Sequence, residues 1–236
     1  MSLAVQATDL ARRFGRRWAL ARLDLEVPVG QRLLVFGANG SGKTTLLRVL
    51  STLLSPSSGT LRLFGQDPRV DPMAVRRRLG LVTHTPGLYE DLSGRDNLAV
   101  QARLLGRPVP ADLLERVGLD GRADPVRAYS AGMRKRLNFA LLLHRAPELV
   151  LLDEPFAALD PAGMDDVADL IRELPGTVIV ASHQVERTSA LCDAALLLEG
   201  GLPRWTGPPA KAWEAWQALH GRKGSRLSDD RPGARS

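Results

Sequence analysis

Cysteine and long apolar runs are scarce in this sequence, and each absence excludes a class of protein. A single cysteine, Cys192, excludes an internal disulfide and a metal cluster held by several thiolates. The longest apolar runs, such as residues 149–152 and 194–198, are the size of a core strand, whereas a membrane-spanning helix needs roughly 18 to 20 residues. The N-terminus lacks an apolar segment that ends at a small-residue cleavage site, so we expect no secretory signal and a cytosolic location.

Aromatic residues are also few, at 5% of the chain, and this bears on the meaning of the net charge of +6. A basic chain suits a polyanion such as nucleic acid or anionic lipid. Here the arginines are scattered, with one triplet at residues 76–78, and no aromatic residues alternate with them to stack on bases. We therefore expect no nucleic-acid partner.

The hydrophobic pattern predicts an α/β chain interrupted by a helical block. Residues 93–143 have a helical pattern without strand signals, and Pro110 is expected to start a helix within them. Strands return afterwards and alternate with helix-compatible segments, which is typical of a parallel sheet. The expected strands are residues 3–7, 19–27, 32–36, 79–83, 149–152, 177–181 and 194–198, with another inside 55–65; the expected helices include 44–54, 73–78, 131–144, 162–174, 186–191 and 209–220.

A glycine-rich segment between the strand 32–36 and the helix 44–54 matches the pattern GxxxxGK[ST]. Its glycines let backbone N–H groups surround a phosphate chain, and the start of the following helix adds a positive dipole. Lys43 supplies charge to the β- and γ-phosphates, and the Thr44 hydroxyl is a ligand for Mg²⁺. The nucleotide-binding residues predicted here are Gly37, Ala38, Asn39, Gly40, Ser41, Gly42, Lys43, Thr44 and Thr45.

Two carboxylates, Asp153 and Glu154, follow the apolar run 149–152. Ligands bind at the carboxyl ends of the strands in α/β sheets, which is where this pair is expected to lie. Asp153 is predicted to hold Mg²⁺, with Thr44, and Glu154 to take a proton from the attacking water or to orient it. These two elements alone do not distinguish kinases, GTPases, helicases and transport ATPases from each other.

Four further segments resemble motifs of the ABC-type ATPases. Residues 129–133, Tyr-Ser-Ala-Gly-Met, resemble the signature motif of that family, and residues 158–160, Ala-Leu-Asp, resemble its D-loop. Residues 181–183, Ala-Ser-His, resemble the switch-histidine segment, and Phe14 stands where the family has an aromatic residue that stacks on adenine. The resemblance covers residues 1 to about 207 and keeps the family's order.

The resemblance implies an α/β fold of the P-loop NTPase (RecA-like) class, with a small antiparallel β subdomain and an inserted α-helical subdomain. It implies one ATPase domain over residues 1–220, with the helical subdomain at about 85–146. The polar tail 221–236 is expected to be disordered.

It also implies that ATP with Mg²⁺ is bound between two subunits paired head to tail, as a homodimer or with another ATPase subunit. Each ATP would meet the P-loop of one subunit and the signature of the other. His183 is expected to contact the γ-phosphate. The residues expected to act in trans are Ser130, Ala131, Gly132 and Asp160.

An integral membrane permease formed by another chain is the implied partner, docked on the helical region 85–127. The protein would then lie at the inner face of the cell membrane, held there by the permease. The C-terminal helix 209–220 has an apolar face that packs either on its own domain or against a partner or membrane surface.

Two residues depart from the family pattern. Ala131 replaces the first glycine of the signature, which adds one methyl group. His84 stands where most members carry the glutamine of the Q-loop, and an imidazole is a poor Mg²⁺ ligand. His84 is therefore predicted to contact the attacking water or a phosphate, or else to couple the site to the partner.

Residues 81–93 and 155–160 resemble the ATP-binding subunits of the heme exporter of cytochrome c maturation, so export of heme is the first interpretation. Exporters of drugs and antibiotics of the ABC-2 type share the Tyr-Ser-x-Gly-Met-Arg pattern and are the alternative. A non-transport ABC ATPase and a small-molecule P-loop kinase are more remote alternatives.

Overall fold

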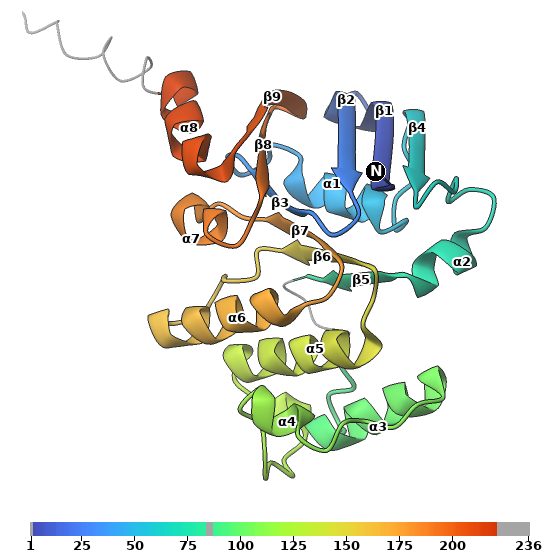
Figure 1. Cartoon of the computed structure of the whole chain (residues 1–236), viewed down its shortest axis with the longest axis vertical. Helices are drawn as coiled ribbons and strands as arrows, with labels where there is room; N and C mark the ends of the chain where they lie inside the picture. Colours follow the sequence, from blue (N-terminus) through green and yellow to red (C-terminus); the bar gives the residue numbers. More distant parts are fainter. Residues whose placement is uncertain (1, 84–86, 221–236) are drawn as a thin grey trace, which may run out of the picture.

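Two β-sheets organise the parts of the chain that the computed structural model describes, residues 2–83 and 87–220 (Figure 1). The smaller sheet is antiparallel and contains β2 (Arg17–Pro28), β1 (Leu3–Phe14) and β4 (Ser58–Leu63) in that order. The larger sheet has the order β5 (Leu79–Val82), β6 (Leu149–Asp153), β7 (Thr177–Ala181), β3 (Arg32–Phe36), β8 (Ala194–Glu199) and β9 (Leu202–Gly207).

The first five strands of the larger sheet are parallel, and β9 is added antiparallel to β8 at the edge. All five residues of β6 and of β7 are buried, because helices or the smaller sheet cover both faces. The carboxyl ends of β3, β6 and β7 lie next to each other, with Val35 and Asp153 both paired with Ala181. The predicted phosphate-binding loop, which follows β3, and the carboxylates Asp153 and Glu154, at the end of β6, therefore lie at the same edge of the sheet.

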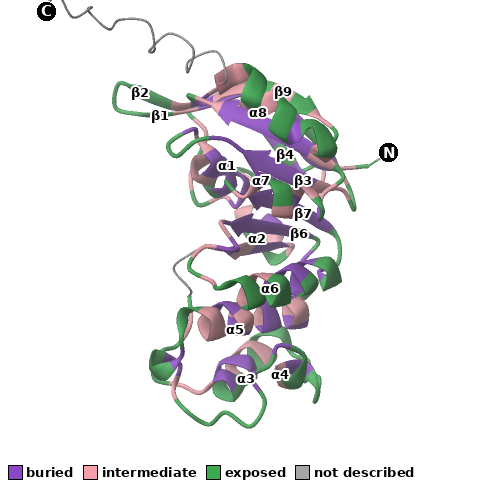
Figure 2. Ribbon diagram, turned by 90° about the vertical axis from the view of Figure 1, so that its left-hand side faces the viewer, coloured by how far each residue is buried: buried purple, intermediate pink, exposed green. Residues whose placement is uncertain are grey.

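Alternate residues of these strands point to opposite sides of the sheet and form separate cores. Leu149, Leu151 and Ile179 pack toward α1 (Lys43–Leu50) and the smaller sheet. Val150 and Val178 pack on the other side, toward α5 (Ala131–Arg145) and α6 (Pro161–Glu173). Figure 2 shows the central strands of the larger sheet coloured as buried, and α6 beside them with an exposed outer face.

The helical block joins this second core and lies at the end of the molecule opposite α8 (Ala212–His220) in Figure 1. It contains α3 (Gly94–Leu105), α4 (Leu113–Arg116), a 3₁₀ turn (Val126–Ala128) and α5. A helix was expected to start at Pro110, whereas α4 starts three residues later, at Leu113, and has only 4 residues. Val117 is its C-cap, and the left-handed Gly118 that comes next stops the helix.

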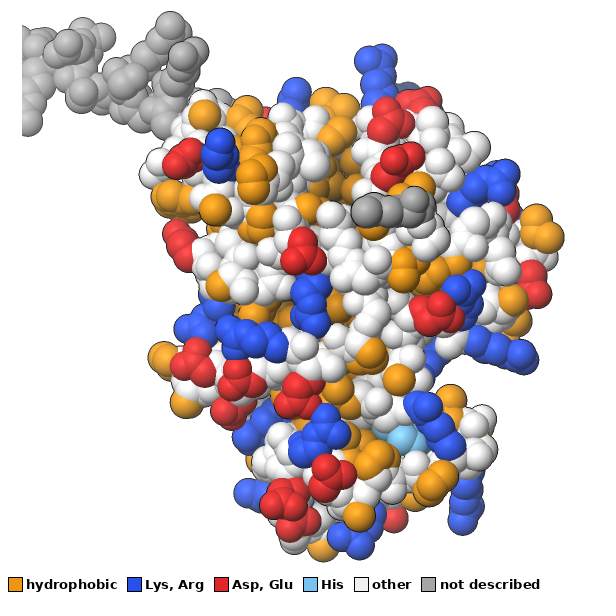
Figure 3. Space-filling model, in the orientation of Figure 1, with side chains coloured by type: hydrophobic (Ala, Val, Ile, Leu, Met, Phe, Trp, Pro, Cys, Tyr) orange, Lys and Arg blue, Asp and Glu red, His pale blue; other side chains and the backbone are white. Residues whose placement is uncertain are grey.

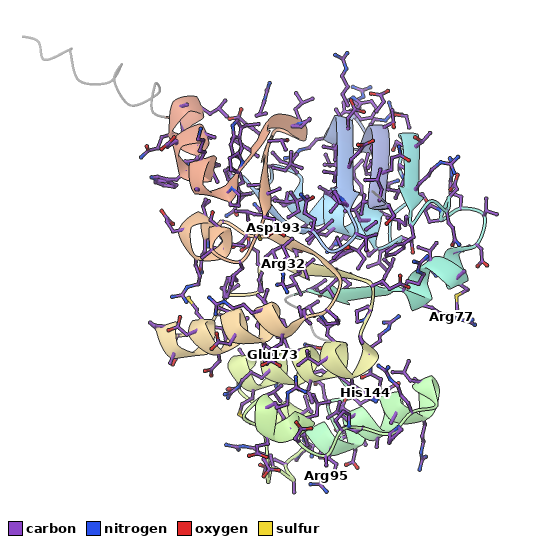
Figure 4. The ribbon with its side chains drawn as sticks, viewed as in Figure 1. Arg32, Arg77, Arg95, His144, Glu173 and Asp193 are labelled. Carbon is purple, nitrogen blue, oxygen red and sulfur yellow. The ribbon has the colours of Figure 1, made fainter. Side chains whose placement is uncertain are left out.

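A half-buried arginine, Arg32, anchors the amino end of β3, the strand that leads into the P-loop. The side chain of Arg32 donates to the carbonyls of Ile171, Arg172 and Leu174 at the end of α6, at 2.7, 3.0 and 3.0 Å. Its backbone N–H donates to Asp193 at 2.8 Å, and Figure 4 shows these two residues close together. Cations at a helix C-terminus are favourable, so β3 is held firmly against α6.

The predicted fold class is confirmed, with differences at the ends of elements. The first strand runs to Phe14 instead of residue 7, and β9 was not predicted. The helices predicted at 73–78 and 186–191 are α2 (Pro72–Arg77) and α7 (Val185–Ser189), and their ends differ from the prediction by only one or two residues. No helix among the described residues is both long and apolar enough to span a membrane. The tail 221–236, for which disorder was expected, lies outside the described residues.

The C-terminal helix packs on its own domain. A 3₁₀ turn (Pro209–Lys211) precedes α8, whose Ala212 is fully buried, and Trp216 and Leu219 pack against the core formed by β3, β8 and α7. Trp213 differs, since 44% of it is exposed. The apolar face thus serves mainly the chain's own core.

Candidate functional site

The P-loop lies between β3 and α1, and its conformation requires glycine at two positions. Gly37 has φ +150°, and a Cβ added there would lie 2.1 Å from the carbonyl oxygen of Leu198. Gly42 has φ +111°, and its Cβ would lie 2.4 Å from the carbonyl oxygen of Ala19. No side chain fits at either distance, so β8 and β2 shape the loop from outside.

Lys43 is the first residue of α1 and is buried, with 6% of its surface exposed. Its Nζ donates to the carbonyls of Gly37 at 2.8 Å and Ala38 at 3.2 Å, inside the loop itself. Burial lowers the pKa of Lys43, while the charges of Glu154 and Asp153 act to raise it. The ammonium group thus points into the concave side of the loop, where a phosphate would give it an anionic partner.

Thr44 and Asp153 come together from α1 and the end of β6. The Thr44 hydroxyl donates to a carboxylate oxygen of Asp153 at 3.1 Å. A hydroxyl and a carboxylate are the hard oxygen ligands that Mg²⁺ prefers, so this pair fits the predicted ion. Both predicted metal ligands therefore face the same point.

Glu154 and His183 meet across the ends of β6 and β7. His183 Nδ1 lies 2.8 Å from Glu154 Oε2, and the backbone N–H of His183 donates to the same oxygen at 3.4 Å. Glu154 has φ +50°, a left-handed conformation that is costly for a non-glycine residue and is concentrated at functional sites. Its own N–H donates to the carbonyl of Ala181 at 2.8 Å, which fixes the turn.

A pocket of about 420 Å³ joins most of these groups. Phe14, which is 47% exposed, forms part of its wall, and the guanidinium of Arg12 covers one face of the ring at 4.7 Å. The residues that line the pocket are Phe14, Arg17, Ala19, Asn39, Gly40, Ser41, Gly42, Lys43, Thr44, Thr45 and Glu154. The remaining P-loop residues, Gly37 and Ala38, line a neighbouring pocket of about 270 Å³ with Asn39, His183, Val185, Trp213 and Trp216.

The residues predicted to act in trans form a different pocket, of about 400 Å³, which shares no lining residue with the first. Ser130 caps α5, accepting from the N–H of Met133 at 3.2 Å, and Asp160 caps α6, accepting from Gly163 at 3.0 Å. Ala131 and Gly132 lie between them in the lining. Within one chain these four residues are close to each other and separate from the P-loop pocket.

Sequence reasoning missed two basic residues at the site. Lys135 is buried and its Nζ donates to the carbonyl of Ala157 at 2.8 Å; burial lowers its pKa, and the charge of Glu154 opposes that shift. Arg17 lines the nucleotide pocket beside Phe14. The turn signal of Gly15 between two basic pairs indicates a hairpin, which would have placed Arg17 opposite Phe14.

His84, predicted as a catalytic residue, lies outside the described residues. Elsewhere, basic and acidic side chains are interspersed over the face of the molecule that Figure 3 shows. On that face no single region of one charge stands out among the described residues.

Comparison with known proteins gives consistent results. The profile of the family described as ABC transporter matches residues 20–157. The daunorubicin resistance ATP-binding protein DrrA3 of Streptomyces coeruleorubidus is 41% identical over 208 residues, covering 84% of this chain and 66% of that protein. The bacitracin transport ATP-binding protein BcrA of Bacillus licheniformis is 33% identical over 209 residues, covering 85% and 68%.

The chain spans about two thirds of the length of these relatives, and 63% of the daunorubicin/doxorubicin resistance ATP-binding protein DrrA of Streptomyces peucetius. Among solved structures, cbiO1 from Clostridium perfringens, part of the ABC transporter complex cbiONQ, has a TM-score of 0.77 and 26% identity over 96% of each chain. The ATP-binding cassette MJ0796, a dimer bound to ADP and Pi, has a TM-score of 0.74 over 87% of this chain and 98% of that one; at 21% identity it supports the fold alone.

Proposed function

The chain belongs to the ABC transporter family, and from this premise we propose that it is the ATP-binding and ATP-hydrolysing subunit of an exporter. The membrane-spanning permease is then a separate chain, which holds this subunit at the inner face of the membrane. The relation between Thr44, Asp153, Glu154 and the P-loop carries the proposal. Glu154 and residues 39–45, which include Thr44, line one pocket, and Asp153 accepts a hydrogen bond from Thr44 beside it.

For the cargo we propose a drug-like or antibiotic molecule. The relatives reported above are resistance or antibiotic-transport proteins by name. The heme-exporter interpretation of residues 81–93 has no support in those names. The signature Tyr-Ser-Ala-Gly-Met-Arg of this chain agrees with the drug-exporter alternative.

In the proposed reaction, Lys43 and the N–H groups of residues 37–45 bind and orient the phosphates of ATP. Thr44 and Asp153 are the residues that would hold Mg²⁺, which when bound neutralises charge on the β- and γ-phosphates. Phe14 offers one ring face to the base, since Arg12 covers the other.

Glu154 is placed to orient the attacking water and accept its proton. The ionised carboxylate is an acceptor only, so the contact with His183 requires the proton on Nδ1. That arrangement leaves Nε2 of His183 available toward the γ-phosphate. His183 thus serves both to hold Glu154 and to sense the phosphate that is cleaved.

We propose that the complete site forms between two copies of this chain. Support comes from the separation of the two pockets within one chain. The pocket that contains Ser130, Ala131, Gly132 and Asp160 includes no residue of the P-loop. A head-to-tail C2 pairing supplies each P-loop with the partner's Ser130 and gives two equivalent sites.

The proposal is tested by measuring phosphate release and ATP affinity for the wild-type chain and for Lys43→Ala. We expect the wild type to bind and hydrolyse ATP in the presence of Mg²⁺, and the variant to lose affinity. Equal affinity of the two proteins, or no binding by the wild type, would overturn the assignment.

A further inference from the structure

One wall of the pocket that the P-loop lines is formed by the β1–β2 hairpin. Phe14 and Arg17 are direct partners in the hairpin register, joined by a two-residue turn. Both side chains line the pocket. The hairpin therefore presents an aromatic ring and a cation next to each other on the same wall.

The guanidinium of Arg17 reaches across to the P-loop. A Cβ placed on Gly40 would lie 3.6 Å from Nη2 of Arg17, so the group lies over the loop at that glycine. The neighbouring basic side chains are engaged elsewhere: Arg12 donates to the carbonyl of Ser55 at 2.9 Å, and Arg13 lies 5.4 Å from the ring of Trp18. Within residues 2–83 and 87–220, the side chain of Arg17 makes no hydrogen bond or ion pair.

A cation in this position matches the charge of the ligand. The pocket contains Lys43 and Arg17 as basic groups and Glu154 as an acidic one. Arg17 lies beside Phe14, the proposed stacking residue for the base, whereas Thr44, Asp153 and Glu154 are the residues proposed to act at the γ-phosphate. A base stacked on Phe14 would thus bring the phosphates nearest the ribose toward the guanidinium, a group suited to phosphate binding.

We propose that Arg17 is a second phosphate-binding cation, which with Phe14 binds the nucleoside diphosphate part common to ADP and ATP. This inference rests on the proposed function of the pocket as an ATP site. Its consequence is that Arg17 contributes equally to ADP and ATP affinity, while discrimination between them depends on groups at the γ-phosphate.

The test is calorimetric titration of the full chain with ADP and with a non-hydrolysable ATP analogue. Arg16 is the matched control, since it is the preceding arginine, is exposed and does not line the pocket. We expect Arg17→Ala to weaken both ligands by the same factor, roughly ten-fold. Arg16→Ala should stay within about two-fold of the wild type, and the loss in Arg17→Ala should shrink at high salt because the contact is partly exposed.

Two outcomes would overturn the assignment: Arg17→Ala binding both ligands as Arg16→Ala does, or Arg17→Ala weakening only the ATP analogue. Lys43→Ala distinguishes this failure from failure of the proposed function. If Lys43→Ala loses binding and Arg17→Ala does not, only the role of Arg17 is wrong. If the wild type binds neither ligand, the assignment of the pocket as an ATP site is wrong, and the proposed role of Arg17 is wrong as well.

Discussion

Nδ1 of His183 lies 2.8 Å from Oε2 of Glu154, and this contact links the ends of the adjacent strands β6 and β7 beside the pocket that Glu154 and the P-loop line. The side chain of Glu154 is 22% exposed and that of His183 is 56% exposed. The carboxylate is therefore held by the protein, while the imidazole faces open space. A γ-phosphate that contacts the imidazole would act directly on the orientation of Glu154.

We predict that Glu154→Gln keeps ATP affinity but lowers the turnover rate by on the order of 100-fold or more, because the amide cannot accept a proton from water. The bound but uncleaved ATP should also favour the closed dimer. Phosphate release, ATP titration and size-exclusion chromatography measure the three effects. Hydrolysis at the wild-type rate would show that Glu154 is not the base.

His183→Ala is expected to lower the turnover rate and to weaken ATP binding more than ADP binding, because the imidazole would contact only the γ-phosphate. His144→Ala is no suitable control, because His144 is buried and contacts the carbonyl of Pro108. Gln184→Ala, a half-buried neighbour in sequence, is the better comparison. An ADP affinity that fell as much as the ATP affinity would contradict this role.

Ser130→Arg is predicted to abolish hydrolysis with little change in ATP binding by the isolated monomer. Ser130 lies in a pocket that shares no residue with the P-loop pocket, so its effect must come across the dimer. Mixing Ser130→Arg with Lys43→Ala gives dimers with one doubly defective site and one intact site. Partial recovery of hydrolysis is expected, and its complete absence would mean that trans contact is wrong or that both sites must work together.

Lys135 is predicted to position the loop that follows Glu154. Its buried Nζ is the hydrogen-bond donor to the carbonyl of Ala157, three residues after Glu154. Lys135→Met removes this donor and should lower kcat several-fold at nearly constant KM for ATP, with a loss of about 1–2 kcal/mol in unfolding free energy. Lys135→Arg should recover part of kcat, and the exposed Lys211→Met is the control. A change in KM alone would contradict a positioning role.

The sequence predicted the P-loop, the acidic pair and the parallel sheet well, because each depends on local residue order. Lys43 lies just after an apolar strand and a turn, and Asp153 and Glu154 lie at the end of an apolar strand. Such units can be recognised from a few consecutive residues of the sequence. Lys135 and Arg17 were missed because their positions depend on contacts between segments that are distant in the sequence. Their roles depend on which carbonyl or loop lies beside them across the fold, and Arg17 also required the hairpin to extend ten residues beyond the apolar run at its start. β9 was missed because only some of its residues are half-buried and its pattern is weak.

Stability is expected to depend on pH through Glu148. Arg78 donates two hydrogen bonds of 2.6 Å to this carboxylate, and they hold its pKa below the ordinary value of 4.5. A lowered folded-state pKa stabilises the fold above the unfolded-state value, and the contribution is lost as the pH falls through the folded-state pKa. Because both groups are partly exposed, Glu148→Gln should cost about 1 kcal/mol or less near neutral pH.

Urea unfolding of the wild type and Glu148→Gln should therefore differ near neutral pH and converge as the solution is acidified below the ordinary carboxyl pKa. Arg78 also lies 3.8 Å from the ring of Phe64, so removal of the arginine would mix two effects. The glutamine variant leaves that contact in place. A difference that did not change with pH would contradict the assigned ion pair.

The last prediction concerns the acidic residues Glu90 and Asp91, which lie in the region proposed to dock the permease. Both are exposed, and Tyr89 beside them is 57% exposed and lines a groove of about 270 Å³ between β5, α3 and α5. Asp91 forms an ion pair with Arg127 within the chain. Reversal of Asp91 would therefore disturb the fold of this loop as well as its surface charge.

Glu90→Lys is consequently the cleaner test, since the described structure gives its side chain no ion pair. We expect this variant to weaken co-purification with the permease or to uncouple ATP hydrolysis from transport several-fold, while the ATPase rate of the isolated subunit stays nearly unchanged. Glu214→Lys makes the same charge change on α8, far from the helical block, and should leave both properties intact. Exposed charges often contribute little to affinity, so the measurement must include coupled rates in the assembled complex; if Glu90→Lys and Glu214→Lys behaved alike in both assays, Glu90 would have no part in docking.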